Sequence, residues 1–181
     1  MTGKILLTSA GFENNRMGKA FVELLTRPVS EAKILLIPTA AICAESLRMV
    51  GKCVDELYAV GITAENIIVY DLDRRMSPSE LQNYDAVYFT GGSPKHLLDK
   101  VSAVDFAPVL KAFVAEGGVF VGVSAGSVLA TDIALVNCRI RALHCQDGSP
   151  KGPVDMEARP DIRLTNYQGL IVDANGAAVI E

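Results

Sequence analysis

Five short runs of apolar residues recur along the first two thirds of the chain and alternate with longer segments of helical character. The runs occupy residues 4–8, 33–38, 67–71, 86–90 and 119–123. Their nearly continuous apolar character is typical of parallel strands that are buried on both faces. Strands that alternate with helices predict right-handed crossovers, with helices on both faces of the sheet. The sequence therefore predicts an α/β fold, a three-layer sandwich around a mostly parallel sheet.

The segments between these runs carry the helical periodicity. We expect helices near residues 16–26, 44–60, 94–100 and 106–116. In the second of them, helical spacing places five residues on one side, and Gly61 is suited to end the helix. These five residues are Leu47, Val50, Val54, Leu57 and Tyr58.

The last third of the chain has a different pattern. Residues 133–140 and 141–145 are predicted to be β segments, and residues 146–153 form a loop rich in Gly and Pro. Shorter strands follow at 161–165, 169–172 and 177–180, and the turn Asp173-Ala174-Asn175-Gly176 predicts a C-terminal β-hairpin. With no internal repeat or linker, a single domain over residues 1–181 is expected.

Several turns that are rich in small residues follow the predicted strands directly. They are Ser9-Ala10-Gly11, Pro38-Thr39-Ala40, Gly91-Gly92-Ser93 and the turn at Ser124. Ligands of parallel α/β sheets bind beyond the carboxyl ends of the strands, so these turns are expected to share one site.

The turn at Ser124 has the Gly-x-Ser-x-Gly pattern of a nucleophile elbow. The apolar run at residues 119–123 ends in Gly122-Val123-Ser124-Ala125-Gly126, and a helix-compatible segment follows. The glycines allow strand and helix to approach closely around a strained serine, whose hydroxyl is then exposed. Ser124 is therefore a candidate nucleophile, and the alternative is a serine that merely caps the helix.

A serine hydroxyl needs a base to remove its proton, and the chain has two histidines. His144 follows a predicted β segment and precedes a flexible loop, so it can project over a neighbouring strand end. His96 lies in the first turn of a predicted helix, where solvent exposure or packing is more common. We therefore prefer His144 as the base and keep His96 as the alternative.

The double glycine after the fourth apolar run is a candidate oxyanion-binding turn. Gly91 and Gly92 expose their backbone amides, which together with the amide of Ala125 can stabilise a tetrahedral intermediate. The alternative is an ordinary strand-to-helix turn that requires glycine for its backbone conformation.

The composition of the chain argues against several classes of binding partner, namely nucleic acids, membranes and metal ions. The net charge is −4 and no basic cluster occurs, which argues against nucleic-acid binding. The first apolar run is too short for a signal peptide, and no stretch is long enough to cross a membrane. The four cysteines lack metal-ligand spacing and are expected to be reduced thiols, so we expect a cytoplasmic protein without a metal or cofactor.

Three segments together resemble one enzyme family. They are Phe89-Thr90-Gly91-Gly92-Ser93-Pro94, the elbow Gly122-Val123-Ser124-Ala125-Gly126-Ser127, and Leu164-Thr165-Asn166-Tyr167-Gln168-Gly169-Leu170-Ile171-Val172. They resemble the S51 serine peptidases, which include aspartyl dipeptidase and cyanophycinase. The resemblance spans nearly the whole chain, and it implies a fold similar to the flavodoxin-like class I glutamine amidotransferases.

The resemblance also implies roles for individual residues. Ser124 would be the nucleophile and His144 the base, and Gly92 and Ala125 would donate to the oxyanion. The family's acid would lie about fifteen positions after the serine, where this chain has Asn137-Cys138-Arg139. We take Asp132 as the provisional acid and leave three further candidates open, Asp147, Asp155 and Glu157.

Two functions remain open at this point. The first is a serine peptidase, a dipeptidase or other exopeptidase that acts on short peptides as a monomer or homodimer. The second is a catalytically weak or inactive relative that binds a small ligand or a protein partner at the same cleft. A substrate with an acidic side chain would require a cation such as Arg139 or Arg141, although both are better explained as solvated surface charges.

Overall fold

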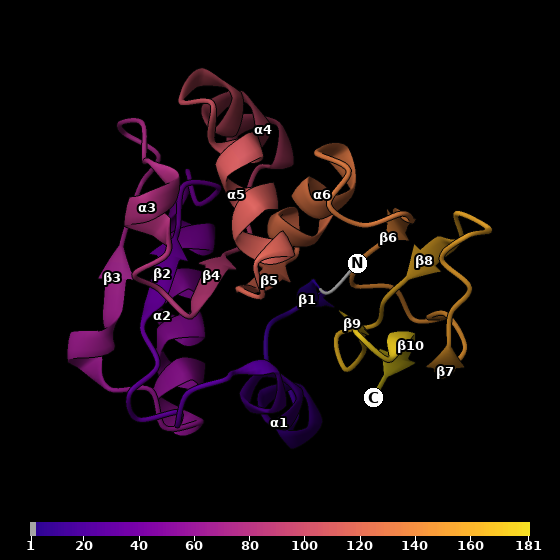
Figure 1. The fold of residues 1–181 in the computed structure, drawn as a ribbon. Helices are drawn as coiled ribbons and strands as arrows, with labels where there is room; N and C mark the ends of the chain where they lie inside the picture. Colours follow the sequence, from indigo (N-terminus) through magenta and orange to yellow (C-terminus); the bar gives the residue numbers. More distant parts are fainter. Residues whose placement is uncertain (1–2) are drawn as a thin grey trace.

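A central sheet of eight strands organises the computed structural model, which describes residues 3–181 (Figure 1). The strand order is β3-β2-β4-β5-β1-β9-β10-β7. The first five strands in this order are mutually parallel, and β1 pairs with β5 from Lys4 opposite Val119 to Thr8 opposite Val123. These strands confirm the five predicted runs to within two residues at each end: β1 (Lys4–Thr8), β2 (Ile34–Ile37), β3 (Ile67–Val69), β4 (Ala86–Phe89) and β5 (Val119–Val123).

Helices cover both faces of this sheet, as predicted for a three-layer sandwich (Figure 1). Helices α1 (Asn15–Leu24) and α2 (Ala44–Ala59) pack on one face, and the 3₁₀ turn η1 (Ala64–Asn66) follows α2. The opposite face carries α3 (Pro78–Leu81), α4 (Pro94–Ala103), α5 (Phe106–Ala115) and α6 (Ala125–Asp132). Successive side chains of a strand point to opposite faces of the sheet, so Leu6 packs in the core on one face and Leu7 in the core on the other. No helix within residues 3–181 combines the length and apolar character needed to cross a bilayer.

The C-terminal part extends the sheet with antiparallel strands. Strand β9 (Gly169–Asp173) pairs with β1, and β10 (Gly176–Ile180) forms the predicted hairpin with β9. Thr8 lies opposite Gly169, which in turn lies opposite Ile180, so β10 ends at the same edge as the parallel strands. The short β7 (Gly152–Pro153) borders β10, and β6 (Arg139–Ala142) pairs with β8 (Asp161–Arg163) in a separate two-stranded sheet.

Two expectations from the sequence are wrong. Most of the predicted β segment at residues 133–140 consists of turns and bends, and only its last two residues enter β6. Ile133, Leu135 and Val136 are buried there without strand pairing, and the exposed Ala134 has a positive φ of 52°. In α2, Leu57 is buried as expected, but Leu47 and Tyr58 are exposed, because the buried stripe of the helix runs through Cys53.

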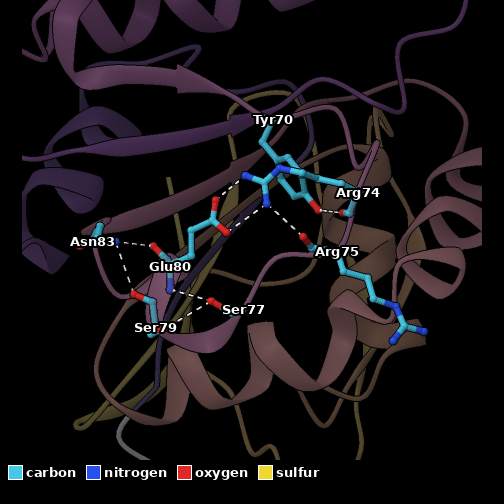
Figure 2. A network of polar contacts seen from close by, with 7 residues as sticks. All are labelled: Tyr70, Arg74, Arg75, Ser77, Ser79, Glu80 and Asn83. Carbon is cyan, nitrogen blue, oxygen red and sulfur yellow. Dashed lines mark hydrogen bonds and ion pairs between the residues drawn. The ribbon is translucent and has the colours of Figure 1, made fainter.

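A network of polar contacts fixes the segment between the outer strand β3 and helix α3 (Figure 2). The Arg74 guanidinium pairs with both carboxylate oxygens of Glu80, and the Tyr70 hydroxyl donates to the Arg74 carbonyl oxygen. Ser77 caps α3 by accepting a hydrogen bond from the Glu80 amide. The Arg75 carbonyl oxygen accepts a hydrogen bond from Arg74, and the Arg75 side chain extends away from the network, so these contacts tether the crossover (Figure 2).

Candidate active site

Ser124 occupies the sharp turn between β5 and α6, and its backbone is strained. Its φ and ψ are 49° and −104°, a conformation that non-glycine residues seldom adopt. The turn is held because the Ser124 amide donates to the carbonyl oxygen of Thr8 at the end of β1 (3.0 Å). The side chain is partly exposed at the carboxyl edge of the parallel strands.

The flanking glycines make this close turn possible. A Cβ atom on Gly122 would lie 2.6 Å from the carbonyl carbon of Gly126, and one on Gly126 would lie 2.7 Å from the Cβ of Phe89. The buried Ser127 hydroxyl lies 2.8 Å from the carbonyl oxygen of Thr8 and 2.7 Å from that of Gly122, and its proton is shared between them. Strand, turn and helix therefore form one tightly packed unit around Ser124.

The structure brings His144 to this serine, as expected from the sequence. His144 Nε2 lies 3.4 Å from Ser124 Oγ, at the long end of hydrogen-bond reach, which is common in the absence of substrate. The His144 backbone has a positive φ of 53°, and its amide donates to Ser9 Oγ (2.6 Å). The turn after β1 thus anchors the histidine, whereas His96 contributes its amide to the cap of α4, accepted by Ser93 Oγ.

The other ring nitrogen of His144 faces an asparagine. Asn166 Oδ1 lies 2.8 Å from His144 Nδ1. An amide oxygen only accepts, so Nδ1 carries the proton in this pair and Nε2 presents its lone pair to Ser124. Asn166 was not predicted for this position, because a carboxylate is the usual partner of Nδ1, although Asn166 stands in one of the three family-like segments.

The loop that carries Asn166 is tied down on both sides. Gln168 Nε2 donates to the Ser149 carbonyl oxygen (3.0 Å), and Gln168 Oε1 accepts from the Thr165 amide (3.3 Å). In addition, Asn14 Nδ2 donates to the Tyr167 carbonyl oxygen (2.9 Å). These bonds fix the backbone on either side of Asn166, so its amide is positioned before substrate arrives.

Asp132, the provisional acid, does not reach His144. It ends α6, which begins directly after Ser124, and eight residues of helix span about 12 Å. There it lines a separate hollow with Asn137 and Arg159, and desolvation raises the pKa of its carboxyl.

The other acidic candidates are also engaged elsewhere or unpaired with the histidine. Asp155 Oδ1 accepts from the Glu157 amide (2.9 Å). Within residues 3–181, neither these two residues nor Asp147 form a hydrogen bond or ion pair with His144, so the position beside Nδ1 belongs to Asn166.

The double glycine lies directly beside the serine. A Cβ atom on Gly91 would lie 3.1 Å from the Ser124 Cβ and 3.7 Å from its Oγ. Gly92 has a φ of 143°, and a Cβ atom there would lie 1.9 Å from the Ala40 carbonyl oxygen, so no side chain fits. No atom of residues 3–181 accepts a hydrogen bond from the amides of Gly91, Gly92 or Ala125. These three amides are therefore free to bind a negatively charged oxygen near Ser124.

A cavity of about 550 Å³ opens beside these groups. One wall is formed by the turns after β1 and β4, and the opposite wall is formed by α2 and the residues that precede it. Ser124 and His144 both border the cavity, whose size is ordinary for a small-molecule site. Within residues 3–181, no three His, Cys, Asp or Glu side chains gather as ligands of a metal ion would.

Comparison with known proteins supports the family and the fold of this chain. The model of peptidase family S51 matches residues 5–139, which include the elbow but neither His144 nor Asn166. A candidate peptidase E protein from Listeria monocytogenes EGD-e has a similar structure, with a TM-score of 0.77 and 17% identity over 100% of this chain and 99% of that chain. A peptidase from an acI-B1 actinobacterium gives a TM-score of 0.54 at 20% identity, over 72% of this chain and 57% of that chain.

Comparison with curated protein sequences found no significant match. The structural neighbours share the fold, and the family match covers the turn at Ser124 and the five parallel strands. The chain therefore belongs to peptidase family S51 and is a hydrolase of the peptidase class.

Proposed function

We propose that this protein hydrolyses short peptides with Ser124 as nucleophile, His144 as base and Asn166 as the residue that orients the base. One observation carries the proposal: His144 joins Ser124 Oγ through Nε2 (3.4 Å) and Asn166 Oδ1 through Nδ1 (2.8 Å). This is the nucleophile–base–orienter arrangement of serine and cysteine hydrolases.

The reaction follows from the positions of these atoms. As Ser124 Oγ attacks the peptide carbonyl carbon, its proton passes to His144 Nε2, and the carbonyl oxygen becomes an oxyanion beside the Gly91, Gly92 and Ala125 amides. The C–N bond then breaks, and the leaving amine takes the proton from Nε2. A water molecule repeats the sequence on the acyl enzyme: it gives a proton to Nε2, adds its oxygen to the carbonyl carbon, and the Ser124 alkoxide leaves and recovers the proton.

A second function deserves a test because Asn166 is neutral. A carboxylate both orients the histidine and stabilises its protonated form, whereas an amide only orients it. The neutral partner favours a slower enzyme, or a relative that binds a small ligand or a protein at the same cleft without turning it over.

We also propose that the protein acts in the cytoplasm, where its four free cysteines would stay reduced.

A fluorophosphonate probe separates the two functions. We expect one equivalent to add to Ser124, as located by peptide mass mapping, and we expect Ser124→Ala to remove this label. His144→Ala should slow labelling strongly, because the hydroxyl then has no base. The matched control is Ser102→Ala, which alters an exposed helix serine that donates to the Leu98 carbonyl oxygen. No label on Ser124, under conditions that label a known serine hydrolase, would contradict the proposed peptidase and favour the binding function.

A further inference from the structure

One wall of the active-site cavity is a stripe along the first half of α2. Glu45, Met49 and Cys53 lie at positions i, i+4 and i+8, so they share one face of the helix over about 12 Å. The turns at Ser9-Ala10 and Gly91-Gly92-Ser93 face this stripe across the cavity. A ligand that fills this cavity therefore contacts this face of α2.

The charge of the cavity lining comes from one carboxylate. Glu45 is the only Asp, Glu, Lys or Arg among the described residues that border the cavity. It is exposed near the start of α2, and within residues 3–181 it takes part in no ion pair or side-chain hydrogen bond. An unpaired carboxylate at the entrance attracts a positive group and repels a negative one.

The arginines considered for binding an acidic substrate are engaged elsewhere. Arg139 Nε lies 2.6 Å from Asp161 Oδ1, and Arg141 Nε lies 3.0 Å from Asp161 Oδ2. Both arginines belong to the small β6–β8 sheet and neither borders the cavity. The paired guanidinium groups hold the pKa of the Asp161 carboxyl below its usual value. An acidic side chain in the cavity would therefore meet no cation.

Apart from Ser46 and the Cys43 thiol, the rest of the α2 wall is apolar. Ile42 and Met49 border the cavity with 61% and 41% of their surface exposed, which leaves apolar area for a ligand to cover. Deeper along the stripe, Cys53 is only 4% exposed, and burial raises the pKa of its thiol to about 11, so this end of the wall is neutral. The wall thus changes from a carboxylate at the entrance to apolar surface inside.

We propose that this cavity selects short peptides that have a free, positively charged amino terminus and an apolar side chain. Glu45 pairs with the terminal ammonium, and Ile42, Met49 and Cys53 contact the side chain. This assignment rests on the proposed function only in that Ser124 then attacks the bound peptide.

Kinetics on a small peptide panel tests the assignment. The wild-type protein should hydrolyse the best-cleaved leucine peptide faster than its N-acetylated form and faster than the peptide with Asp at the amino terminus. Glu45→Gln should raise KM for the free leucine peptide roughly fivefold, with little change in kcat, and so remove the advantage over the acetylated form. Asp55→Asn is the matched control, since it removes one charge from an exposed position on the same helix and outside the cavity. A wild-type preference for the Asp peptide, or equal behaviour of the two variants, would overturn the assignment.

A binding measurement keeps this test separate from catalysis. Cys43 is an exposed thiol at the cavity entrance, so a peptide bound there should slow its alkylation. We expect the leucine peptide to protect Cys43 in Ser124→Ala, and the acetylated peptide or the added Glu45→Gln change to weaken that protection. Protection without labelling or hydrolysis at Ser124 would reject the proposed peptidase and keep the binding site. Hydrolysis with equal alkylation of Cys43, with and without saturating leucine peptide, would reject the binding site and keep the peptidase.

Discussion

The Asn166 side chain sets the tautomer of His144 at this site. Its oxygen occupies the place beside His144 Nδ1 where a serine peptidase commonly has a carboxylate. Since the amide fixes the tautomer but provides no charge, the site should be correctly arranged yet lack part of the stabilisation of the protonated imidazole.

Removing the Asn166 amide should therefore damage catalysis more than binding. In Asn166→Ala, Nδ1 loses its acceptor, and we expect kcat to fall on the order of 10²- to 10⁴-fold with KM nearly unchanged. The control Asn83→Ala changes an exposed asparagine whose amide donates to carbonyl oxygens near the end of α3 (Figure 2). Equal kcat values in the two variants would show that Asn166 does not orient the base.

Supplying the missing charge should have the opposite effect. In Asn166→Asp, the carboxylate still accepts from Nδ1 and also favours the protonated imidazole. We expect kcat to increase and the rising limb of kcat/KM against pH to move to higher pH, because the base must be unprotonated to act. An unchanged pH profile in this active variant would argue against contact between residue 166 and the base.

Glu56 should make stability depend on pH. Its Oε2 accepts from the Phe12 amide (2.7 Å), while Oε1 is buried without a hydrogen bond and lies 3.7 Å from Lys52 Nζ. Desolvation raises the pKa of the Glu56 carboxyl, although the Phe12 amide and Lys52 oppose this. The folded state therefore binds a proton on Glu56 more tightly than the unfolded chain does. The stability that this proton contributes is present below about pH 4.5 and is lost as the pH rises through the raised pKa of the folded state.

Glu56→Gln should accordingly raise Tm at pH 8 and lose this advantage as pH approaches 4.5. Thermal unfolding followed by circular dichroism at both pH values measures the difference. Glu31→Gln, which changes an exposed loop residue, should shift Tm equally little at both. A lower Tm for Glu56→Gln at pH 8 would mean that its ion pair with Lys52 outweighs the cost of burial.

At the scale of the elements, the contact between β5 and α6 should tolerate change poorly. In Gly122→Ala, the new methyl group would meet the Gly126 backbone at 2.6 Å, so strand and helix must separate. We expect a loss of about 1–3 kcal/mol in the free energy of unfolding and a loss of activity as Ser124 is displaced. The measurement is urea denaturation together with fluorophosphonate labelling.

Gly51→Ala is the matched substitution in α2. Gly51 is exposed, and no atom lies within 4 Å of a Cβ placed there. Alanine should stabilise this helix by about 0.5–1 kcal/mol and leave labelling of Ser124 unchanged. Equal stability changes in the two variants would contradict the tight contact proposed for Gly122.

The sequence predicted the elements well wherever local pattern and burial agree. The five parallel strands satisfy this condition, since strands buried on both faces show continuous apolar runs. Residues 133–138 do not, because an apolar run that packs as buried turns has the same composition as a buried strand. The contact between Asn166 and His144 was not predictable, because it joins two loops 22 residues apart whose approach depends on the pairing of β9 with β1.

At the scale of the whole molecule, each face of the sheet has its own hydrophobic core, and each core contains one buried cysteine. Cys53 belongs to the layer of α1 and α2, and Cys138 belongs to the opposite layer. Burial raises the pKa of both thiols to about 11, so neither should react while the protein is folded.

These thiols test whether residues 1–181 unfold as a single domain. In a urea titration with pulses of a thiol reagent, Cys53 and Cys138 should become reactive at the same urea concentration, whereas the exposed Cys43 should react without urea. Mass mapping of the modified peptides measures each site separately. Different midpoints for Cys53 and Cys138 would show that the two layers unfold independently.

The direction of β10 has a practical consequence for handling this protein. Ile180 lies level with Gly169 and Thr8, so β10 ends at the edge that carries Ser124. Three strand spacings, about 14 Å, separate it from β5 in the sheet. A fluorophore or affinity tag attached after Glu181 would therefore begin within reach of the cleft and could report on its occupancy or obstruct it. The start of β1 lies at the opposite edge of the sheet, so fusions placed at that end of the chain keep the tag away from the peptide.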